Sequence, residues 1–199
     1  MSEEYLTLLD WRRRVADLYT AVRAKLPADA PGAHALWRST RDDLFRRHAQ
    51  SPLLESDRAN FEGLPYYDYD PRLAKRGKVR PLGEERYDVG TSAGGVIPFV
   101  RFGLVELDVG SLEVFWLDAY SGGVFVPFRD STAGTTTYGG GRYLLDTAKS
   151  ADLGAIGDEL VLDFNFAYHP SCRYDPKWVC PLAPLGNRLQ VAIEAGERM

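Results

Sequence analysis

Two polar motifs near the carboxyl end of the chain contain side chains that could do chemistry together. DFNFAYH places Asp163, Asn165 and His169 at spacings of two and four, and NRLQVAIE places Arg188 and Glu194 six positions apart, which is also an even spacing. Because side chains alternate between the faces of a strand, each motif is expected to present one polar and one apolar face. If the two strands pair, Asp163 and Glu194 could act as a carboxylate pair in general acid–base catalysis.

A glycine-rich turn upstream supplies a candidate anion-binding side chain. Three glycines, residues 139–141, directly precede Arg142. Glycine lets a backbone approach a ligand closely, and arginine is a bidentate donor to anions. The turn lacks the spacing of a phosphate-binding P-loop. Two interpretations stay open: Arg142 binds an anion, or it holds a hairpin corner.

These residues predict a polar site for a small molecule, and in a closed barrel that site could be an internal cavity. The expected catalytic groups are Asp163, Glu194 and Arg142. The expected ligand-binding side chains are Asn165, Tyr138, Tyr168, Asn187 and Arg188. Small-molecule binding, or a hydrolase-like reaction on the bound molecule, is the favoured function. The alternative is a non-catalytic interaction or structural module. The cofactor is unknown from the sequence, which also does not decide whether the protein is an enzyme.

Both cysteines lie in the long connection between the two motifs, at about residues 169–187. Seven residues separate Cys172 from Cys180, and His169 and Asp175 are the nearest further ligand candidates. The close cysteine spacing typical of zinc sites is missing. A metal site, a redox pair and buried thiols that anchor the loop all stay open. The last interpretation is favoured, so no metal ligand is assigned.

The first half of the chain predicts two helices followed by an irregular connection. Apolar residues recur at spacings of three and four over residues 3–26, and a second helix is expected at about 33–49. Residues 51–85 predict the irregular connection. Within it we expect a short strand from Tyr66 to Tyr69 and an exposed loop from Lys75 to Arg80.

From Arg86 onward the pattern changes to short strands separated by turns. The segment from Leu112 to Tyr120 is apolar on both faces, as in the middle of a sandwich or barrel. Strands are expected near 86–90, 97–109, 112–120, 123–128, 142–147, 159–168 and 188–195.

The predicted fold class is α+β and mainly β. We expect one domain over residues 1–199, with a helical segment at 1–50 and an antiparallel β-domain at 86–199. That β-domain is expected to be a barrel or sandwich of about seven or more strands, with the two N-terminal helices packed on it.

Composition and charge limit the classes of partner. The chain is 45% apolar and 26% charged, with a net charge of −4, which is ordinary globular composition. Residues 101–170 contain four basic side chains against ten acidic ones, so nucleic acid is not expected as a partner. Neither a membrane-spanning stretch nor a targeting segment is visible, and a cytoplasmic location is expected. Oligomeric state is not indicated.

Three motifs of the carboxyl-terminal half resemble one known family. PFRDSTAGTTTYGGGRYL, LDFNFAYHPSC and CPLAPLGNRLQVAIEAGE are similar to the uncharacterised prokaryotic family catalogued as domain of unknown function (DUF) 1684. The likeness extends towards the N-terminus through NFEGLPYYDYDP, HAQSPLL and the region of Trp11. It implies a shared fold and a shared site, and it supplies no reaction.

Overall fold

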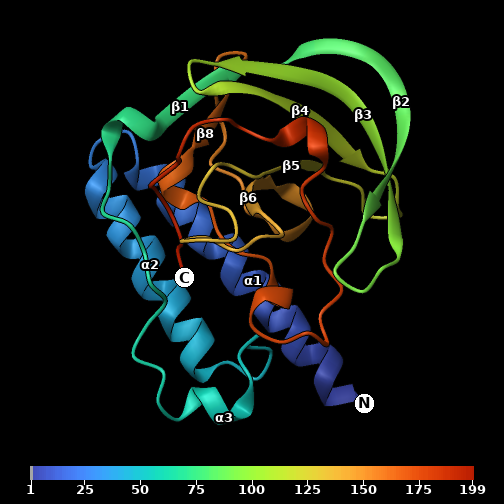
Figure 1. Ribbon diagram of the computed structural model, residues 1–199. Coiled ribbons are helices and arrows are strands. Elements are labelled where there is room, and N and C mark those ends of the chain that lie inside the picture. Colours follow the sequence, from blue (N-terminus) through green and yellow to red (C-terminus); the bar gives the residue numbers. More distant parts are fainter. Residues whose placement is uncertain (1) are drawn as a thin grey trace.

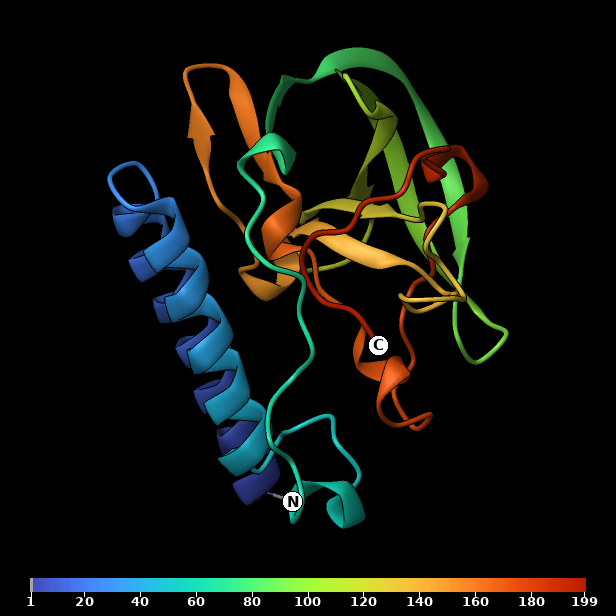
Figure 2. The same ribbon diagram turned by 60° about the vertical axis from the view of Figure 1, so that its left-hand side comes forward.

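The computed structural model describes residues 2–199 and places a pair of helices against a β-rich body (Figure 1). Helices α1 (Ser2–Lys25) and α2 (Ala30–Arg47) run antiparallel, side by side (Figure 2). The side chain of Asp29 accepts a hydrogen bond from the Gly32 N–H and so caps the start of α2. The two predicted helices are confirmed to within three residues at each end. A third, short helix is α3 (Glu55–Arg58).

Two antiparallel sheets form the body. The five-stranded sheet has the order β2-β3-β4-β5-β6, and the three-stranded sheet has the order β1-β8-β7. Their bounds are β1 Ala74–Lys78, β2 Arg80–Gly90, β3 Val96–Leu107, β4 Gly110–Leu117, β5 Val124–Phe128, β6 Arg142–Asp146, β7 Ala155–Ile156 and β8 Glu159–Asp163. The predicted fold class, α+β and mainly β with two N-terminal helices, is confirmed. The barrel alternative is wrong, because the sheets do not close.

The middle of β4 is buried on both faces, as its sequence predicts. Val114 packs in the core between the sheets, and Phe115 packs on the other side with Phe99 and Phe125. Trp116 differs from the prediction, since 44% of it is exposed. Apolar packing on both sides of β4 therefore ties the five-stranded sheet to the rest of the molecule.

The predicted irregular connection contains more structure than its sequence suggests. Residues 74–78 form β1, paired with β8, where the sequence predicts an exposed loop. Gly77 explains the difference, because a Cβ at this position would lie only 2.3 Å from Cγ1 of Val105. A glycine therefore lets β1 approach β3 closely. The strand predicted from Tyr66 to Tyr69 is reduced to one isolated bridge between Tyr66 and Glu197.

The two polar motifs do not form the predicted pair of long strands. β8 ends at Asp163, and the chain then forms a 3-10 helix at Phe164–Phe166. Residues 188–195 form no strand, and Arg188 makes only an isolated bridge with Arg129. The expected common polar face is therefore absent from this part of the described chain.

Between residues 2 and 199, no helix is both long and apolar enough to cross a membrane.

Candidate functional site

Arg142, the predicted anion-binding residue, is a buried structural cation. Its side chain is 1% exposed and lies 3.4 Å from the carboxylate of Asp130. It also donates to the backbone carbonyls of Ile193, at 2.8 Å, and of Ala195. These contacts engage the donors of the guanidinium group. They favour the interpretation that Arg142 holds a corner of the fold.

Asp163 and Asn165 meet each other but not Arg142. The Asp163 carboxylate accepts hydrogen bonds from the backbone N–H of Asn165 at 2.9 Å and from its side-chain amide at 2.7 Å. Asn165 in turn bonds both the N–H and the carbonyl of Asp70. Burial raises the pKa of Asp163 to about 6, against the lowering effect of the two Asn165 bonds. These two residues clamp the end of β8 to the segment that enters β1.

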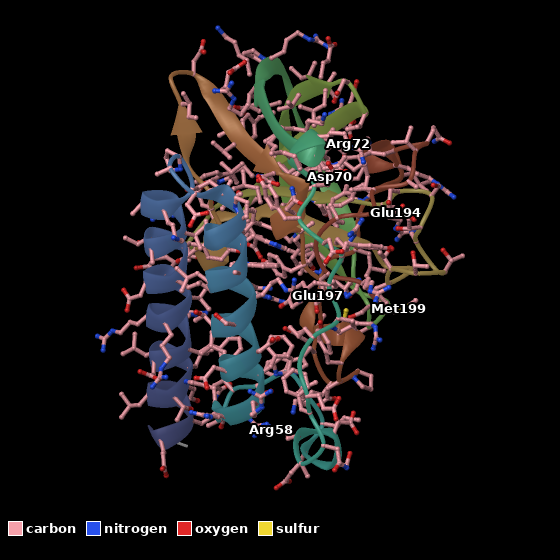
Figure 3. All side chains as sticks on the ribbon, turned by 90° about the vertical axis from the view of Figure 1, so that its left-hand side faces the viewer. Arg58, Asp70, Arg72, Glu194, Glu197 and Met199 are labelled. Atoms are coloured by element: carbon pink, nitrogen blue, oxygen red, sulfur yellow. The ribbon has the colours of Figure 1, made fainter. Side chains whose placement is uncertain are left out.

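Glu194 is exposed and does not join a carboxylate pair with Asp163. Figure 3 shows Glu194 apart from Glu197, which lies nearer the helices. Arg188 is exposed as well, whereas Asn187 is fully buried and bonds backbone groups of Glu113. The predicted catalytic combination of Asp163, Glu194 and Arg142 is therefore not assembled, because residues 188–195 do not pair with β8.

Glu197, which the sequence does not single out, occupies a central buried position. Its Oε2 accepts from Nη2 of Arg41 on α2 at 2.8 Å and from the His169 N–H at 2.9 Å. Burial raises the pKa of Glu197, and Arg41 opposes that rise. The Arg41–Glu197 pair therefore joins α2 to the segment around residue 197.

His169 is held as a neutral ring. Its Nε2 accepts from the backbone N–H of Tyr138 at 3.1 Å, so the proton lies on Nδ1, 3.8 Å from Oε1 of Glu197. Burial lowers the pKa of His169 to about 2, and the charge of Arg142 adds to that effect. A ring so placed does not serve as a general base near neutral pH.

The two cysteines are free and lie next to each other. Sγ of Cys180 accepts a hydrogen bond from the backbone N–H of Cys172 at 3.4 Å. The hydroxyl of Tyr138 lies 3.8 Å from Sγ of Cys172. Among residues 2–199, no group of three or more His, Cys, Asp or Glu side chains is arranged to hold a metal ion.

A cavity of about 260 Å³ lies between α1, α2 and the loop that carries the cysteines. We call it the helix–loop cavity. Its apolar walls include Trp11, Val15, Phe45 and Val179. Its polar lining includes Tyr19, Arg41, Tyr168, His169 and Cys180. Three residues singled out from the sequence thus line it, namely Tyr168, His169 and Cys180, and the other predicted site residues do not.

The charged side chains that line the helix–loop cavity are all basic. They are Arg12 on α1, Arg41 on α2 and Lys149, which follows β6. Arg41 also stacks on the rings of Trp37 and Phe45, at 4.9 and 5.3 Å from their centroids. The spacing of four between Trp37, Arg41 and Phe45 is the sequence signal that could have indicated this arrangement.

Comparison with known proteins agrees with the resemblance in the motifs. The family described as protein of unknown function (DUF1684) matches residues 59–198, so the likeness expected at Trp11 and at residues 48–54 lies outside the match. No curated protein matches the chain.

A solved structure is also similar. It is the solution NMR structure of an uncharacterised protein of Haloarcula marismortui, 39% identical, which covers 81% of this chain and 90% of that chain with a TM-score of 0.58. With the family match spanning most of its length, the chain belongs to the DUF1684 family of proteins of unknown function.

Proposed function

We propose that the protein binds a small organic anion with an apolar body in the helix–loop cavity. The observation that carries this proposal is the combination of aromatic and aliphatic walls with charged lining residues of one sign only. Concave, mainly apolar cavities with a few converging polar groups are the usual sites of small ligands. The carboxylate pair predicted for hydrolysis is not part of the proposal, because Asp163 and Glu194 do not meet.

The floor of the cavity has donors that remain free for a ligand. Arg41 uses Nε on Tyr66 and Nη2 on Glu197, and no acceptor within the described chain engages its Nη1. The hydroxyl oxygen of Tyr19 accepts from the indole N–H of Trp37 at 3.2 Å, which leaves its own proton available. A carboxylate between Arg41 and Tyr19 would receive two hydrogen bonds, one of them charge-assisted.

The rim adds further positive charge. No salt bridge within residues 2–199 engages Arg12, whereas Lys149 is paired with the Asp146 carboxylate at 3.6 Å, so the unpaired positive charge at the rim is that of Arg12. His169 contributes no charge, since its pKa is lowered to about 2. The positive potential at the mouth therefore favours an anion over a neutral molecule of the same shape.

The size of the cavity restricts the ligand to a small body. Sites for drug-sized molecules usually enclose about 300–1,000 Å³, and this cavity is smaller, at about 260 Å³. A single aromatic ring or a short alkyl chain suits walls made by Trp11, Val15 and Phe45. We therefore expect monocyclic or short-chain carboxylates as the chemical class.

A matched pair of probes tests the proposal. Phenylacetate and 2-phenylethanol share their ring and differ in charge, and hexanoate and hexanol repeat the comparison with an alkyl body. Calorimetric titration should show binding of the acids at least about tenfold tighter than that of the alcohols, equivalent to about 1.4 kcal/mol. Equal affinity for acid and alcohol would refute the charge argument.

Two variants locate the binding site. Val15→Phe places extra volume in the cavity wall and should abolish binding, and Arg12→Gln should weaken acid binding without affecting the alcohols. Arg13→Gln is the control, because Arg13 is also an exposed arginine of α1 but does not line the cavity. If Val15→Phe binds the acids like the wild type, the ligand binds elsewhere and the proposal fails.

A further inference from the structure

The loop that closes one side of the helix–loop cavity holds the two cysteine thiols against each other. Cys172 lies at the start of the loop and is half-buried, whereas Cys180 is buried in the cavity wall. The contact of 3.4 Å from the Cys172 N–H to Sγ of Cys180 places the sulfur of one cysteine against the backbone of the other, so the two cysteines are neighbours in space although seven residues separate them in the chain.

Different neighbouring groups distinguish the two thiols. The adjacent Cys180 and, after it, the Tyr138 hydroxyl at 3.8 Å lower the pKa of Cys172, against the effect of burial. The adjacent Cys172 and, after it, burial raise the pKa of Cys180. Cys172 therefore has the character of the nucleophilic cysteine, and Cys180 has that of the resolving cysteine.

The loop is also anchored from the other side. The backbone N–H and carbonyl of Cys180 bond the hydroxyl and the N–H of Ser92, in the turn between β2 and β3. The Ser92 hydroxyl donates in addition to the carbonyl of Trp178. This anchoring fixes Cys180 while Cys172 keeps access to solvent.

We propose that Cys172 and Cys180 form a dithiol site that reduces a hydroperoxide and closes to an intramolecular disulfide. In the first step, the Cys172 thiolate attacks the outer peroxide oxygen. The O–O bond breaks, Cys172 becomes a sulfenic acid, and the leaving oxygen takes a proton and departs as an alcohol, or as water from hydrogen peroxide. In the second step, the Cys180 sulfur attacks the Cys172 sulfur, and the sulfenic oxygen leaves as water.

The two steps balance. Two thiols and one hydroperoxide give one disulfide, one alcohol and one water, so the two electrons lost by the sulfurs reduce the O–O bond. The Tyr138 hydroxyl, 3.8 Å from Sγ of Cys172, is a positioning residue that supports the thiolate. A cellular dithiol or an added thiol reductant would restore both cysteines by exchange. The reaction does not depend on which ligand occupies the cavity.

The first experiment uses the wild-type protein and hydrogen peroxide. One equivalent should remove both free thiols, measured by thiol titration after denaturation, and peptide mass analysis should find Cys172 linked to Cys180 in one chain. Dithiothreitol should reverse the change. Two thiols that persist after several equivalents of peroxide, or a disulfide that joins two chains, would overturn the proposal.

Single variants separate the roles of the two sulfurs. Cys180→Ser should stop at a sulfenic acid on Cys172 that dimedone traps, whereas Cys172→Ser should leave a slowly reacting Cys180. Because the neighbouring groups lower the pKa of Cys172 and raise that of Cys180, Cys172 in the Cys180→Ser variant should react with peroxide at pH 6 faster than Cys180 in the Cys172→Ser variant. Equal rates in the two variants would contradict the assignment.

A pH profile tests the positioning role of Tyr138. Tyr138→Phe should move the midpoint of Cys172 alkylation upward, and Tyr67→Phe is the control. The Tyr67 hydroxyl bonds Thr136 at 2.7 Å in the same loop as Tyr138, and it does not contact either cysteine. A wild-type midpoint near that of free cysteine, about 8.5, or an identical shift in both variants, would refute the dithiol geometry.

Discussion

Replacing Asp163 by asparagine should make the protein more stable at neutral pH, although it removes a buried hydrogen-bonding carboxylate. Asp163 is 2% exposed, and the two hydrogen bonds that it accepts both come from Asn165 to its Oδ1. Asparagine keeps that oxygen as an acceptor and still suits the start of the 3-10 helix at Phe164–Phe166. The substitution therefore removes a charge while retaining the contacts.

The magnitude follows from the pKa of Asp163, which burial raises from 3.8 to about 6. Well below pH 3.8 the carboxyl is protonated in both the folded and unfolded states, and it has no effect on stability. As the pH rises through 4 to 6, the unfolded chain releases this proton first, so stability falls. Above pH 6 the loss reaches about 3 kcal/mol. Asp163→Asn has no such loss.

Urea unfolding of both proteins between pH 4 and pH 8 tests this prediction. The free energy of unfolding of Asp163→Asn minus that of the wild type should increase by up to about 3 kcal/mol as the pH rises. Other titrating groups act in both proteins, and their effects cancel in this difference. Asp158→Asn is the control: Asp158 is exposed beside Lys78, which lowers its pKa, so this substitution should have a small effect of opposite sign.

A difference that does not change with pH would refute the assigned pKa of Asp163. A variant that becomes less stable than the wild type as the pH rises would show that the negative charge itself stabilises the fold.

Three further substitutions test the buried polar framework and a glycine. Arg142→Met should lower the free energy of unfolding by about 3–5 kcal/mol, because Asp130 loses its cation, and adding Asp130→Asn should restore part of it in urea unfolding. Gly141→Ala should lower the melting temperature, because φ is +98° and the new Cβ would lie 2.6 Å from a carbonyl oxygen; Gly139→Ala, with no atom closer than 3.7 Å, should not. His34→Phe should gain stability relative to the wild type as the pH falls from 6.5 to 4, because burial lowers the pKa of His34 to about 4; parallel pH profiles in calorimetry would contradict this.

The elements that the sequence predicts well are those whose apolar residues follow a regular period. The helical stripe that includes Leu18 and Val22 is buried in α1, and the doubly apolar run around Val114 forms the middle of β4. In such segments, the burial of side chains and the hydrogen bonding of the backbone favour the same local structure. Position and type could therefore be predicted from the residues themselves.

The same rule fails at residues 188–195, for a physical reason. Leu189 and Ile193 are buried and Glu194 is exposed, so the alternation correctly reports which side faces the core. The alternation does not predict whether the segment pairs with another strand. Here the carbonyls of Ile193 and Ala195 accept hydrogen bonds from the guanidinium of Arg142 in place of a neighbouring strand. A period of two therefore predicts burial here and not a strand, and the site built on that strand was misplaced.

The helix–loop cavity could not be predicted from local sequence. Trp11 and Val15 belong to the apolar stripe of α1, which is also the pattern of a fully packed helix. Their cavity partners Val179 and Cys180 lie more than 160 residues away along the chain. Only the tertiary arrangement decides whether such a stripe is completely covered or leaves space for a ligand.

The contacts of Arg142 also bear on the order in which the chain folds. The carbonyls of Ile193, Ala195 and Glu197 accept hydrogen bonds from the side chain of Arg142 on β6, 51 to 55 positions earlier. These partners exist only after β6 has joined its sheet and Asp130 has taken its place beside the guanidinium. The last segment should therefore dock late, after the main barrier. Changes within it should accelerate unfolding and leave the folding rate almost unaltered.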